Sequence, residues 1–336
     1  MTTTAPDATA AAGILRLGNL FCQSKALLTA VRLDLFAMLH TGPATEEEIR
    51  VRLGLHGRGL AHFLRLLIAM GLLREEAGRF RNAEGADRFL VPGRPGCVAG
   101  FLHGADLNLY PVYGRLTEAL RTGKPQADGD YTAMLDDSAA LGHFVRMMDG
   151  VTQGLGPQLL AALDGTDFRS VLDLGGCRGH LAAQLASARP ELEGHVLDLP
   201  QMEPFFDEYM TEQGLAERIT FHPGDFFRTP ALPSADVLIF GHILHDWDPQ
   251  QRQELLAKAY RAVNPGGALL VYDRMLGQAE DDTENLVASL NMLLVTEGGA
   301  EYTVAELSAE AHAAGFGGIT HRPLGDYDTL VLCRKS

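Results

Sequence analysis

Cysteine is scarce in this chain of 336 residues. Its four cysteines, Cys22, Cys97, Cys177 and Cys333, lie far apart and form no Cys-x-x-Cys pair. Zinc fingers and disulfide-stapled domains need cysteines at short, regular spacings, so this pattern excludes both classes. Unpaired cysteines are typical of a reducing compartment, and the sequence therefore predicts a cytoplasmic protein.

Long apolar runs are also missing. Every apolar stretch is interrupted before the roughly 18 residues that a membrane-spanning helix requires. The first residues are rich in Thr and Ala and lack the basic start of a secretion signal, so we expect a disordered tail over residues 1–12. We therefore expect no membrane partner.

Positive charge is in short supply. The chain has 28 Lys and Arg residues against 43 Asp and Glu residues, which gives a formal net charge of −15 at pH 7. Nucleic acids and anionic lipids attract positively charged surfaces, so we expect neither as a partner. The charge balance works by exclusion, and it suits a small neutral or cationic ligand no better than many other partners.

Helical patterning dominates the start of the chain. Apolar residues recur at helical spacing over residues 13–40, and Thr45 with Glu48 forms a capping box that begins a short helix. A further amphipathic helix and a hairpin with its tip at Ala77-Gly78 follow. This order is typical of a winged helix. In an acidic chain, a winged helix is expected to serve as a dimerisation domain; the alternative is that it binds DNA and the protein is a regulator.

Strands and helices alternate after residue 169, which predicts a parallel α/β sheet. Helices are predicted over residues 249–263 and 303–314. We place a dimerisation domain at residues 1–97, and linking helices with the α/β domain at residues 98–336. The predicted strands are short apolar runs at residues 170–174, 195–198, 219–222, 236–240, 268–273 and 329–332.

A glycine-rich turn follows the first of these strands. The run Asp-Leu-Gly-Gly-Cys-Arg-Gly spans residues 173–179 and leads into a helix. Such a turn lets backbone N–H groups approach a ligand at the carboxyl edge of a sheet, with Gly175 at its start. Asp198 ends the second predicted strand, where a carboxylate accepts hydrogen bonds from a ribose diol.

The turn distinguishes between two nucleotide cofactors. An NAD fingerprint requires glycines at the positions that Cys177 and His180 hold. Asp173 stands two positions before Gly175, where its carboxylate repels a pyrophosphate and attracts an ammonium group. These residues favour S-adenosylmethionine, whose methionine moiety carries an ammonium. A strand, turn and helix without a ligand is the alternative.

An acidic and aromatic run follows the third predicted strand. It reads Gly224-Asp225-Phe226-Phe227. A carboxylate can accept a hydrogen bond from the adenine amino group, and an aromatic ring can lie on the purine face. We therefore expect Gly224, Asp225 and Phe226 to bind the adenine end of the cofactor.

Three further motifs complete a recognisable order: Ile-Leu-His-Asp-Trp-Asp at residues 243–248, Asn-Pro-Gly-Gly at 264–267 and Gly-Gly-Ala-Glu-Tyr-Thr at 298–303. Together with the runs above, they resemble class I S-adenosylmethionine-dependent O-methyltransferases of the plant caffeate and bacterial natural-product type, which includes acetylserotonin- and hydroxyneurosporene-like enzymes. The resemblance covers nearly the whole chain. It implies a Rossmann-like α/β domain with a seven-stranded sheet, preceded by a winged-helix dimerisation domain, and a homodimer.

The resemblance also implies roles for individual residues. His245 corresponds to the general base, and Asp273 and Glu301 to its acidic partners. An imidazole titrates near neutral pH, and a carboxylate on its second nitrogen sets the tautomer. Trp247 is expected to form a wall of the cofactor pocket. Gly241 replaces a lysine of plant members, so one cofactor contact differs there.

The acceptor pocket is expected along the linking helices and the segment before the last motif. A methionine-rich apolar lining suits a flat aromatic acceptor. The residues expected to contact the acceptor are His103, Asn108, Met148, Asn291 and Met292.

The sequence thus predicts methyl transfer from S-adenosylmethionine to a hydroxyl, here a phenol, of a small aromatic secondary metabolite. N- or C-methylation of a related substrate and an S-adenosylmethionine-binding enzyme that transfers no methyl group are the alternatives. His242 and His245 lie three residues apart, but no third ligand follows at a matching spacing, so we expect no metal.

Overall fold

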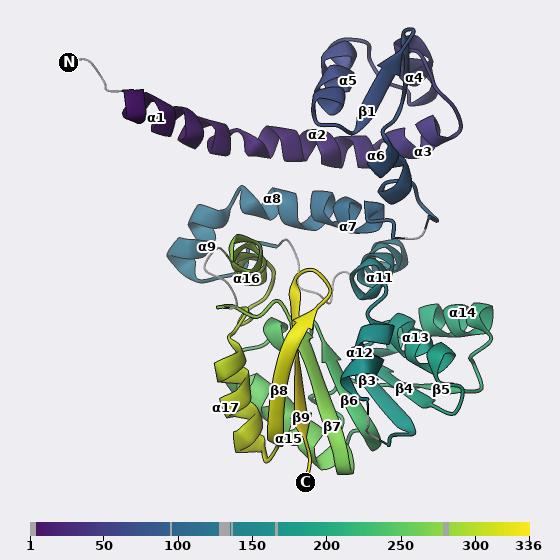
Figure 1. Ribbon diagram of the computed structural model, residues 1–336, viewed down its shortest axis with the longest axis vertical. Helices are drawn as coiled ribbons and strands as arrows, with labels where there is room; N and C mark the ends of the chain where they lie inside the picture. The colour runs from purple at the N-terminus through teal and green to yellow at the C-terminus, as the bar shows by residue number, and fades with distance from the viewer. Residues whose placement is uncertain (1–4, 95, 128–134, 136, 165–166, 278–281) are drawn as a thin grey trace. The chain divides into compact units, whose positions relative to one another are not determined.

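The computed structural model describes residues 5–94, 96–127, 135, 137–164, 167–277 and 282–336. The chain forms two compact units, Met1–Pro111 and Val112–Ser336, which are described here one at a time (Figure 1). No helix in the described part of the chain is long and apolar enough to cross a membrane.

The first unit is mainly helical. The capping box between Thr45 and Glu48 is present, with both hydrogen bonds formed. Its core gathers apolar side chains such as Phe36, Leu64 and Leu67 around the short hairpin. The elements are α1 (Ala5–Gly18), α2 (Leu20–Arg32), α3 (Leu35–His40), α4 (Glu46–Arg52), α5 (Leu60–Ala69), β1 (Leu73–Glu76), β2 (Arg79–Asn82), α6 (Glu84–Phe89), α7 (Ala99–Gly104) and the π-helical turn η1 (Ala105–Leu109).

Two expectations for this unit need correction. The disordered tail over residues 1–12 is wrong from residue 5 onward, because α1 begins at Ala5; an alanine-rich run has the highest intrinsic helix propensity. Residues 1–4 lie outside the described part. The continuous helical pattern over residues 13–40 is also divided into three helices, with Asp34 in the left-handed region at φ 54°.

The contacts divide the chain after Pro111, whereas the predicted domain boundary follows residue 97. The first unit therefore includes α7 and η1 in addition to the winged-helix elements. Helix α8 (Tyr110–Tyr113) lies at the division. The assignment of dimerisation to residues 1–97 and of the remaining chain to the α/β domain stays a prediction.

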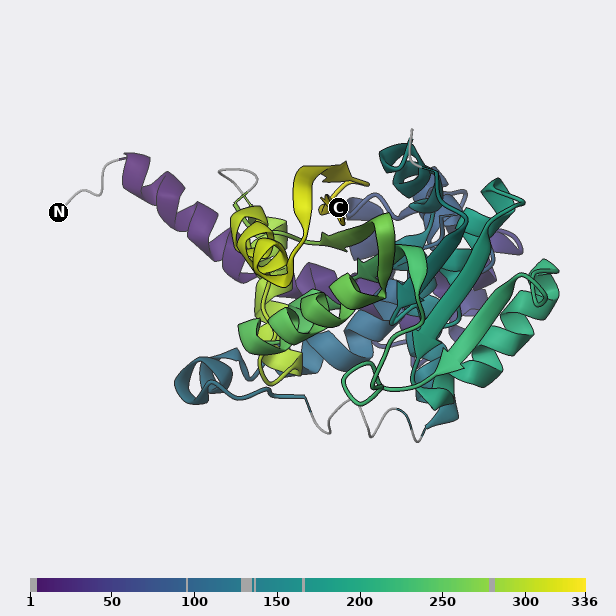
Figure 2. The same cartoon turned by 90° about the horizontal axis from the view of Figure 1, so that it is seen from below.

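A seven-stranded sheet forms the centre of the second unit, which confirms the fold class (Figures 1 and 2). The strand order is β5-β4-β3-β6-β7-β9-β8; β9 pairs antiparallel with both β7 and β8, and the other pairs are parallel. The strands are β3 (Ser170–Leu174), β4 (Glu193–Asp198), β5 (Ile219–Pro223), β6 (Ala235–Gly241), β7 (Val263–Asp273), β8 (Gly317–Leu324) and β9 (Asp328–Arg334).

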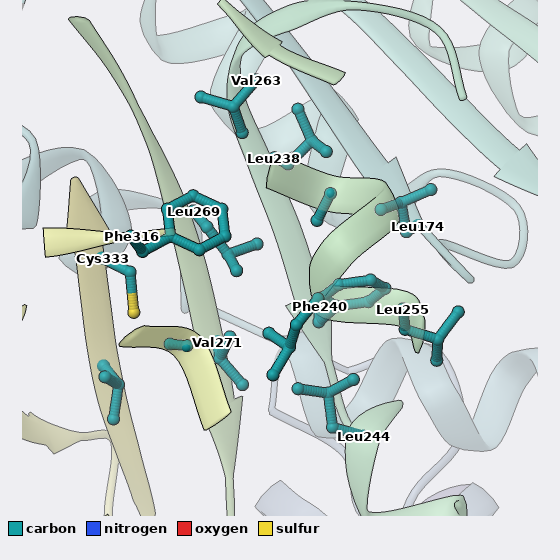
Figure 3. Packing of buried hydrophobic residues seen from close by; sticks show 14 of the residues in the cluster. Leu174, Leu238, Phe240, Leu244, Leu255, Val263, Leu269, Val271, Phe316 and Cys333 are labelled. Carbon is teal, nitrogen blue, oxygen red and sulfur yellow. The ribbon is translucent and has the colours of Figure 1, made fainter. Parts of the chain in front are cut away.

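Helices cover both faces of this sheet. Successive strand residues point to opposite faces. Leu172 and Leu174 pack with α15 and α17, in the cluster that Figure 3 shows around Leu174. Val171 packs on the other face with α12 and α13. The helices of this unit are α9 (Leu116–Thr122), α11 (Ser138–Thr152), α12 (Gly156–Ala162), α13 (His180–Ala188), α14 (Glu203–Gln213), α15 (Pro249–Ala262), α16 (Thr283–Val295) and α17 (Val304–Ala314), with 3₁₀ turns η2 (Pro200–Met202) and η3 (Leu244–Asp246).

Candidate active site

The glycine turn lies at the carboxyl end of β3, at the edge where ligands bind open α/β sheets. Gly175 and Gly179 both have φ 75°, and Cys177 has φ 49°. A Cβ atom on Gly175 would lie 2.2 Å from Ile243 Cδ1, and one on Gly179 would lie 2.5 Å from Met210 Cε. The turn therefore needs glycine at both positions, whereas the cysteine retains the left-handed conformation.

A pocket opens beside this turn and contains the buried carboxylate of Asp173. Burial, with the nearby charge of Asp198, raises the pKa of Asp173 to about 7. Among the described residues, no donor is hydrogen-bonded to this carboxylate. The lining comprises Met148, Asp149, Thr152, Asp173, Gly175, Gly176, Cys177, His180, Leu181, Gly241 and Tyr272.

Gly241 is the last residue of β6 and lines this pocket. A Cβ atom there would lie 2.2 Å from the Tyr272 ring, so any side chain at this position would displace the tyrosine. The site thus lacks a long basic side chain at residue 241 for a steric reason.

Asp198 is the last residue of β4, and its carboxylate is hydrogen-bonded to the glycine turn. Its Oδ2 accepts a hydrogen bond from Cys177 N at 2.8 Å, and its Oδ1 accepts one from Leu199 N at 2.7 Å. Burial raises the pKa of Asp198 to about 6, against the opposite effect of these two bonds. The predicted contact with a ribose diol stays a prediction.

An aromatic cluster follows β5. The ring centroids of Phe226 and Phe227 lie 6.0 and 4.7 Å from that of Trp247, in edge-to-face orientations. The Trp247 Nε1 atom is buried without a hydrogen-bond partner in the described part of the chain. Asp225 Oδ1 accepts from Phe227 N at 2.8 Å, and Gly224 N donates to Asp198 O at 2.9 Å, which joins this loop to β4.

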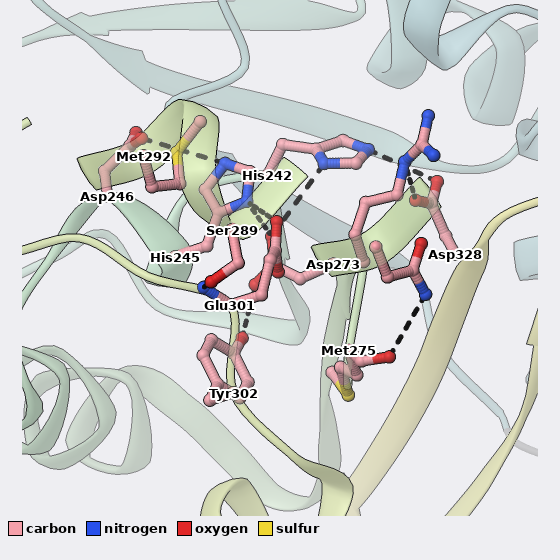
Figure 4. Close-up of polar contacts among 12 residues, drawn as sticks. His242, His245, Asp246, Asp273, Met275, Ser289, Met292, Glu301, Tyr302 and Asp328 are labelled. Atoms are coloured by element: carbon pink, nitrogen blue, oxygen red, sulfur yellow. Dashed lines mark hydrogen bonds and ion pairs between the residues drawn. The ribbon is translucent and has the colours of Figure 1, made fainter. Parts of the chain in front are cut away.

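His245 lies in η3, and two acidic side chains meet its Nδ1 atom (Figure 4). Glu301 Oε1 is 2.7 Å from Nδ1 and Asp273 Oδ1 is 3.5 Å from it. Both carboxylate side chains are fully buried, and the His245 side chain is 10% exposed. Asp246 Oδ1 lies on the other side of the ring, 3.7 Å from Nε2. The structure therefore brings together the three residues that the family resemblance grouped.

Opposing effects set the pKa of His245. Burial lowers it, but the charge of Asp273 and the hydrogen bond with Glu301 outweigh burial and raise the pKa to about 10. Burial raises the pKa of Asp273 to about 7, although the positive charge of His245 acts in the opposite direction. The imidazole is consequently a stronger base than a histidine in water.

Close backbone packing keeps His245 in place. A Cβ atom on Gly299 would lie 2.5 Å from the His245 carbonyl oxygen and 2.9 Å from the Asp246 carbonyl carbon. The Gly298-Gly299 pair therefore lets the Glu301 loop approach the histidine turn. This explains in physical terms why a glycine pair precedes Glu301 in the sequence.

Two groups near the cluster had no predicted role. The Tyr302 hydroxyl donates to Asp273 Oδ2, and both side chains are buried. His242 has φ 53°, and its Nε2 lies 3.2 Å from Asp328 Oδ2 (Figure 4). The two groups are Tyr302 and Asp328. Tyr302 directly follows Glu301 in the last motif, so its position could have indicated a role; Asp328 is distant in sequence from every motif, and nothing indicated one.

His242, His245 and Asp273 bring possible metal-ligand atoms within 4.8 Å of one another, the one such group of three among the residues described. The His245 Nδ1 atom already hydrogen-bonds Glu301, and Glu301 is absent from this group. The expectation of a metal-free site stays a prediction.

The predicted acceptor contacts lie in both units. Met148 lines the pocket beside the glycine turn. Asn291 and Met292 lie on α16, and Asn291 Oδ1 accepts a hydrogen bond from the Tyr113 hydroxyl at 2.8 Å. His103 on α7 and Asn108 on η1 belong to the first unit, and their contact with an acceptor stays a prediction.

Comparison with known proteins finds two family models. An O-methyltransferase domain matches residues 113–317, and an O-methyltransferase dimerisation domain matches residues 15–92. Together these matches span most of the chain.

The chain is also similar to curated and solved proteins along nearly its whole length. It is 46% identical over 330 residues to the tetracenomycin polyketide synthesis 8-O-methyl transferase TcmO of Streptomyces glaucescens, covering 96% of both chains. It is 37% identical over 324 residues to the N,N-dimethyltransferase OxyT of Streptomyces rimosus, covering 94% of both. Human N-acetylserotonin methyltransferase, solved in complex with SAM, has a TM-score of 0.88 and 27% identity, with 97% of this chain and 98% of that chain covered.

Proposed function

Because the chain belongs to the O-methyltransferase family, we propose that His245 is the general base that activates a phenolic hydroxyl of a small aromatic secondary metabolite. The chain is an S-adenosylmethionine-dependent O-methyltransferase. The observation that carries the proposed role is the 2.7 Å contact between His245 Nδ1 and Glu301 Oε1.

This contact sets the tautomer of His245. An ionised carboxylate only accepts hydrogen bonds, so the proton of the neutral ring resides on Nδ1 and the lone pair on Nε2. The Nε2 atom is then the base, and Glu301 and Asp273 stabilise the imidazolium that forms when it takes a proton. Aligning the base and its carboxylates before the acceptor binds lowers the reorganisation that the reaction requires.

The two carboxylates suit His245 to a phenolic acceptor. A phenolic hydroxyl ionises near pH 10, as the tyrosine side chain does. Burial lowers the pKa of His245, but the charge of Asp273 and the hydrogen bond with Glu301 outweigh burial and raise it, so Nε2 of the deprotonated ring takes a phenolic proton more readily than an ordinary imidazole would.

Residues in and beside the pocket offer partners for both ends of the cofactor. S-adenosylmethionine supplies a methyl group on a positively charged sulfur. In our proposal the Asp173 carboxylate pairs with its ammonium, since that anion is buried and has no protein donor among the described residues. Asp198 accepts hydrogen bonds from the ribose hydroxyls, and Gly224, Asp225 and Phe226 bind the adenine. The Trp247 Nε1–H group has no hydrogen-bond partner among the described residues, and in our proposal it donates a hydrogen bond at the adenine end.

The acceptor is proposed to contact His103, Asn108, Met148, Asn291 and Met292. TcmO, by its name, acts in tetracenomycin polyketide synthesis, and a further relative from Streptomyces sahachiroi with 32% identity is a 3-hydroxy-5-methyl-1-naphthoate 3-O-methyltransferase. Polarizable methionines adapt to flat rings of this kind. We therefore propose a polycyclic or naphthalene-like phenol as the acceptor class.

N-methylation is a second candidate, because OxyT shares 37% identity and is named an N,N-dimethyltransferase. An amine acceptor is methylated through its own lone pair, so it needs His245 only to remove a proton after or during transfer. The strongly basic His245 favours the hydroxyl acceptor over the amine.

The dimerisation domain supports a proposed homodimer. Helices α1 and α2 expose a row of large apolar side chains in the first unit: Ile14, Leu15, Leu17, Leu20 and Phe21. Exposed apolar rows of this kind mark protein interfaces. Sedimentation of the unaltered chain should give a dimer, and a Leu17→Asp, Phe21→Asp variant a monomer.

The four free cysteines support a proposed cytoplasmic location.

The test of the proposed function identifies both products. The purified chain is incubated with S-adenosylmethionine labelled with ¹³C in the methyl group and with a panel of polyketide phenols and aromatic amines. We expect S-adenosylhomocysteine and a methoxy carbon signal in equal amounts. A labelled N-methyl signal instead would establish the second candidate, and no S-adenosylhomocysteine with any acceptor would contradict both.

A further inference from the structure

The pocket beside the glycine turn has an anion for the cofactor's ammonium, but the methionine moiety also ends in a carboxylate. The turn itself has few free donors. The backbone N–H groups of Gly175, Cys177 and Gly179 already donate to Leu197 O, Asp198 Oδ2 and Gly176 O. The Gly176 N–H group remains, but a carboxylate in this pocket, close to Asp149 and Asp173, calls for a side-chain donor in addition.

Arg178 is the nearest arginine in sequence, and only part of its guanidinium is hydrogen-bonded, since its Nε atom is buried without a hydrogen-bond partner among the described residues. Its guanidinium pairs with the Asp149 carboxylate and lies over the Tyr209 ring, 4.3 Å from the centroid. Arg178 is not among the residues that line the pocket. It connects the turn with α11 and α14 and neutralises Asp149.

His180 is the lining residue that can donate. It is the first residue of α13, and its ring lies between α11 and the next turn of its own helix. Its Nδ1 atom is 2.7 Å from Thr152 Oγ1 and 3.3 Å from Gln184 Nε2. The Nε2 atom has no hydrogen bond to the described residues. The ring is therefore held through one nitrogen only.

The orientation of Gln184 determines which nitrogen of His180 carries the proton. Gly156 N, which can only donate, lies 3.2 Å from Gln184 Oε1, and Thr152 O, which can only accept, lies 3.0 Å from Gln184 Nε2. These two backbone groups assign the amide oxygen and nitrogen without ambiguity. The Gln184 amide nitrogen is consequently a donor where it meets His180 Nδ1.

The hydroxyl of Thr152 agrees with this assignment. Its single hydrogen has three acceptors within reach, His180 Nδ1 at 2.7 Å, Met148 O at 3.2 Å and Asp149 O at 3.4 Å, and the shortest contact is to the histidine. With two donors at Nδ1, the proton of the neutral ring resides on Nε2. Burial lowers the pKa of His180, although Asp149 raises it, so the neutral form is favoured at pH 7.

We propose that the Nε2–H group of His180 donates a hydrogen bond to the carboxylate of the methionine moiety, with Thr152 and Gln184 holding the ring in the donating tautomer. This inference rests on the proposed cofactor pocket. It divides the recognition of the amino acid end between Asp173, which binds the ammonium, and His180, which binds the carboxylate. The N-terminus of α13 adds a favourable dipole for the same charge.

The test compares two ligands that differ only in this carboxylate. Binding of S-adenosylmethionine and of decarboxylated S-adenosylmethionine is measured by isothermal titration calorimetry on the unaltered chain and on His180→Leu. A hydrogen bond to a charged group predicts about a ten- to hundredfold weaker binding of S-adenosylmethionine by His180→Leu. Binding of the decarboxylated ligand should change less than about twofold on the same scale.

Two further variants keep the outcome interpretable if His180→Leu folds poorly. His180→Gln retains an N–H donor and should recover most of the affinity for S-adenosylmethionine. His222→Leu removes another half-buried histidine, on β5, and should bind both ligands as the unaltered chain does.

Three results would overturn the proposal. Equal losses for both ligands in His180→Leu would make His180 structural, and no loss for either would assign the carboxylate to another donor. If the unaltered chain binds neither ligand, the proposed cofactor pocket itself is wrong. That last result contradicts the proposed function, whereas the first two contradict only the role of His180.

Discussion

Oε1 of Glu301 lies 2.7 Å from Nδ1 of His245, although the two residues are 56 positions apart in the chain. Asp273, at the end of β7, adds a second carboxylate 3.5 Å from the same nitrogen. Since both acidic groups meet one side of the ring, Nε2 on the other side is left as the basic atom.

Replacing Glu301 with Gln should shift the pH dependence of the reaction. The hydrogen bond and charge of Glu301 raise the pKa of His245, so the variant's base should have a lower pKa. The rising limb of kcat/KM against pH should then move to lower pH, and the plateau should fall about tenfold, the order expected for one hydrogen bond to a charged group.

The matched control is Glu306→Gln, since Glu306 caps α17 rather than contacting His245. It should leave the pH profile unchanged. An unaltered profile in Glu301→Gln as well would separate Glu301 from the base.

Removing the Tyr302 hydroxyl should weaken the same base indirectly. That hydroxyl donates to Asp273 Oδ2 and acts to lower the pKa of Asp273, against the raising effect of burial. In Tyr302→Phe, Asp273 should therefore stay protonated to a higher pH and support the imidazolium less. The pKa of His245 should then fall, so the rising limb of kcat/KM against pH should move to lower pH and the plateau should fall, as in Glu301→Gln. A lower plateau with an unmoved limb would indicate a packing defect.

Cofactor affinity should depend on pH through Asp173. Its pKa in the unliganded chain is about 7, and an ammonium ligand pairs with the ionised form only. The Kd for S-adenosylmethionine should thus rise by about tenfold for each pH unit below 7. Calorimetry between pH 5 and 8 measures this.

Asp173→Asn should bind S-adenosylmethionine weakly and remove most of this pH dependence. Asp326→Asn, a change in the exposed turn between β8 and β9, should keep both the affinity and its pH dependence. A steep pH dependence in Asp173→Asn would assign the titration to another group.

Adding one methyl group at Gly299 should impair catalysis. Its Cβ atom would lie 2.5 Å from the His245 carbonyl oxygen, so the Glu301 loop or the histidine turn must move. A misplacement of the catalytic groups by about 1 Å predicts a fall in kcat of about 10²-fold. Gly317→Ala, with open space around its Cβ, is the control and should keep full activity. Full activity in Gly299→Ala would contradict the tight packing at the base.

Local patterns were sufficient to predict the sheet and the cofactor turn. Strand β3 was predicted at its observed residues, because a short apolar run followed by glycines has few alternatives. Strand β8 was not predicted from its residues. It lies at the sheet edge with mostly exposed side chains, and its Gly-Gly-Ile-Thr-His-Arg run has no buried face to produce an alternation.

Tertiary contacts were harder to predict. No spacing indicates that Asp273 and Glu301 meet His245; only the family resemblance grouped them, and the structure brings them together. The contacts of Arg178 with Asp149 and Tyr209 join three elements, and nothing in the local sequence marks them. Such pairs depend on how the helices pack, which a single sequence does not show.

The most direct test of the central claim is the single-turnover rate of His245→Ala with a phenolic acceptor identified by the ¹³C-methyl experiment. We predict that methyl transfer slows by about 10²–10⁴-fold, the usual contribution of a general base. The Kd for S-adenosylmethionine should stay the same, since His245 lies outside the pocket that Asp173 lines. Methyl transfer at the full rate in His245→Ala would show that His245 is not the base.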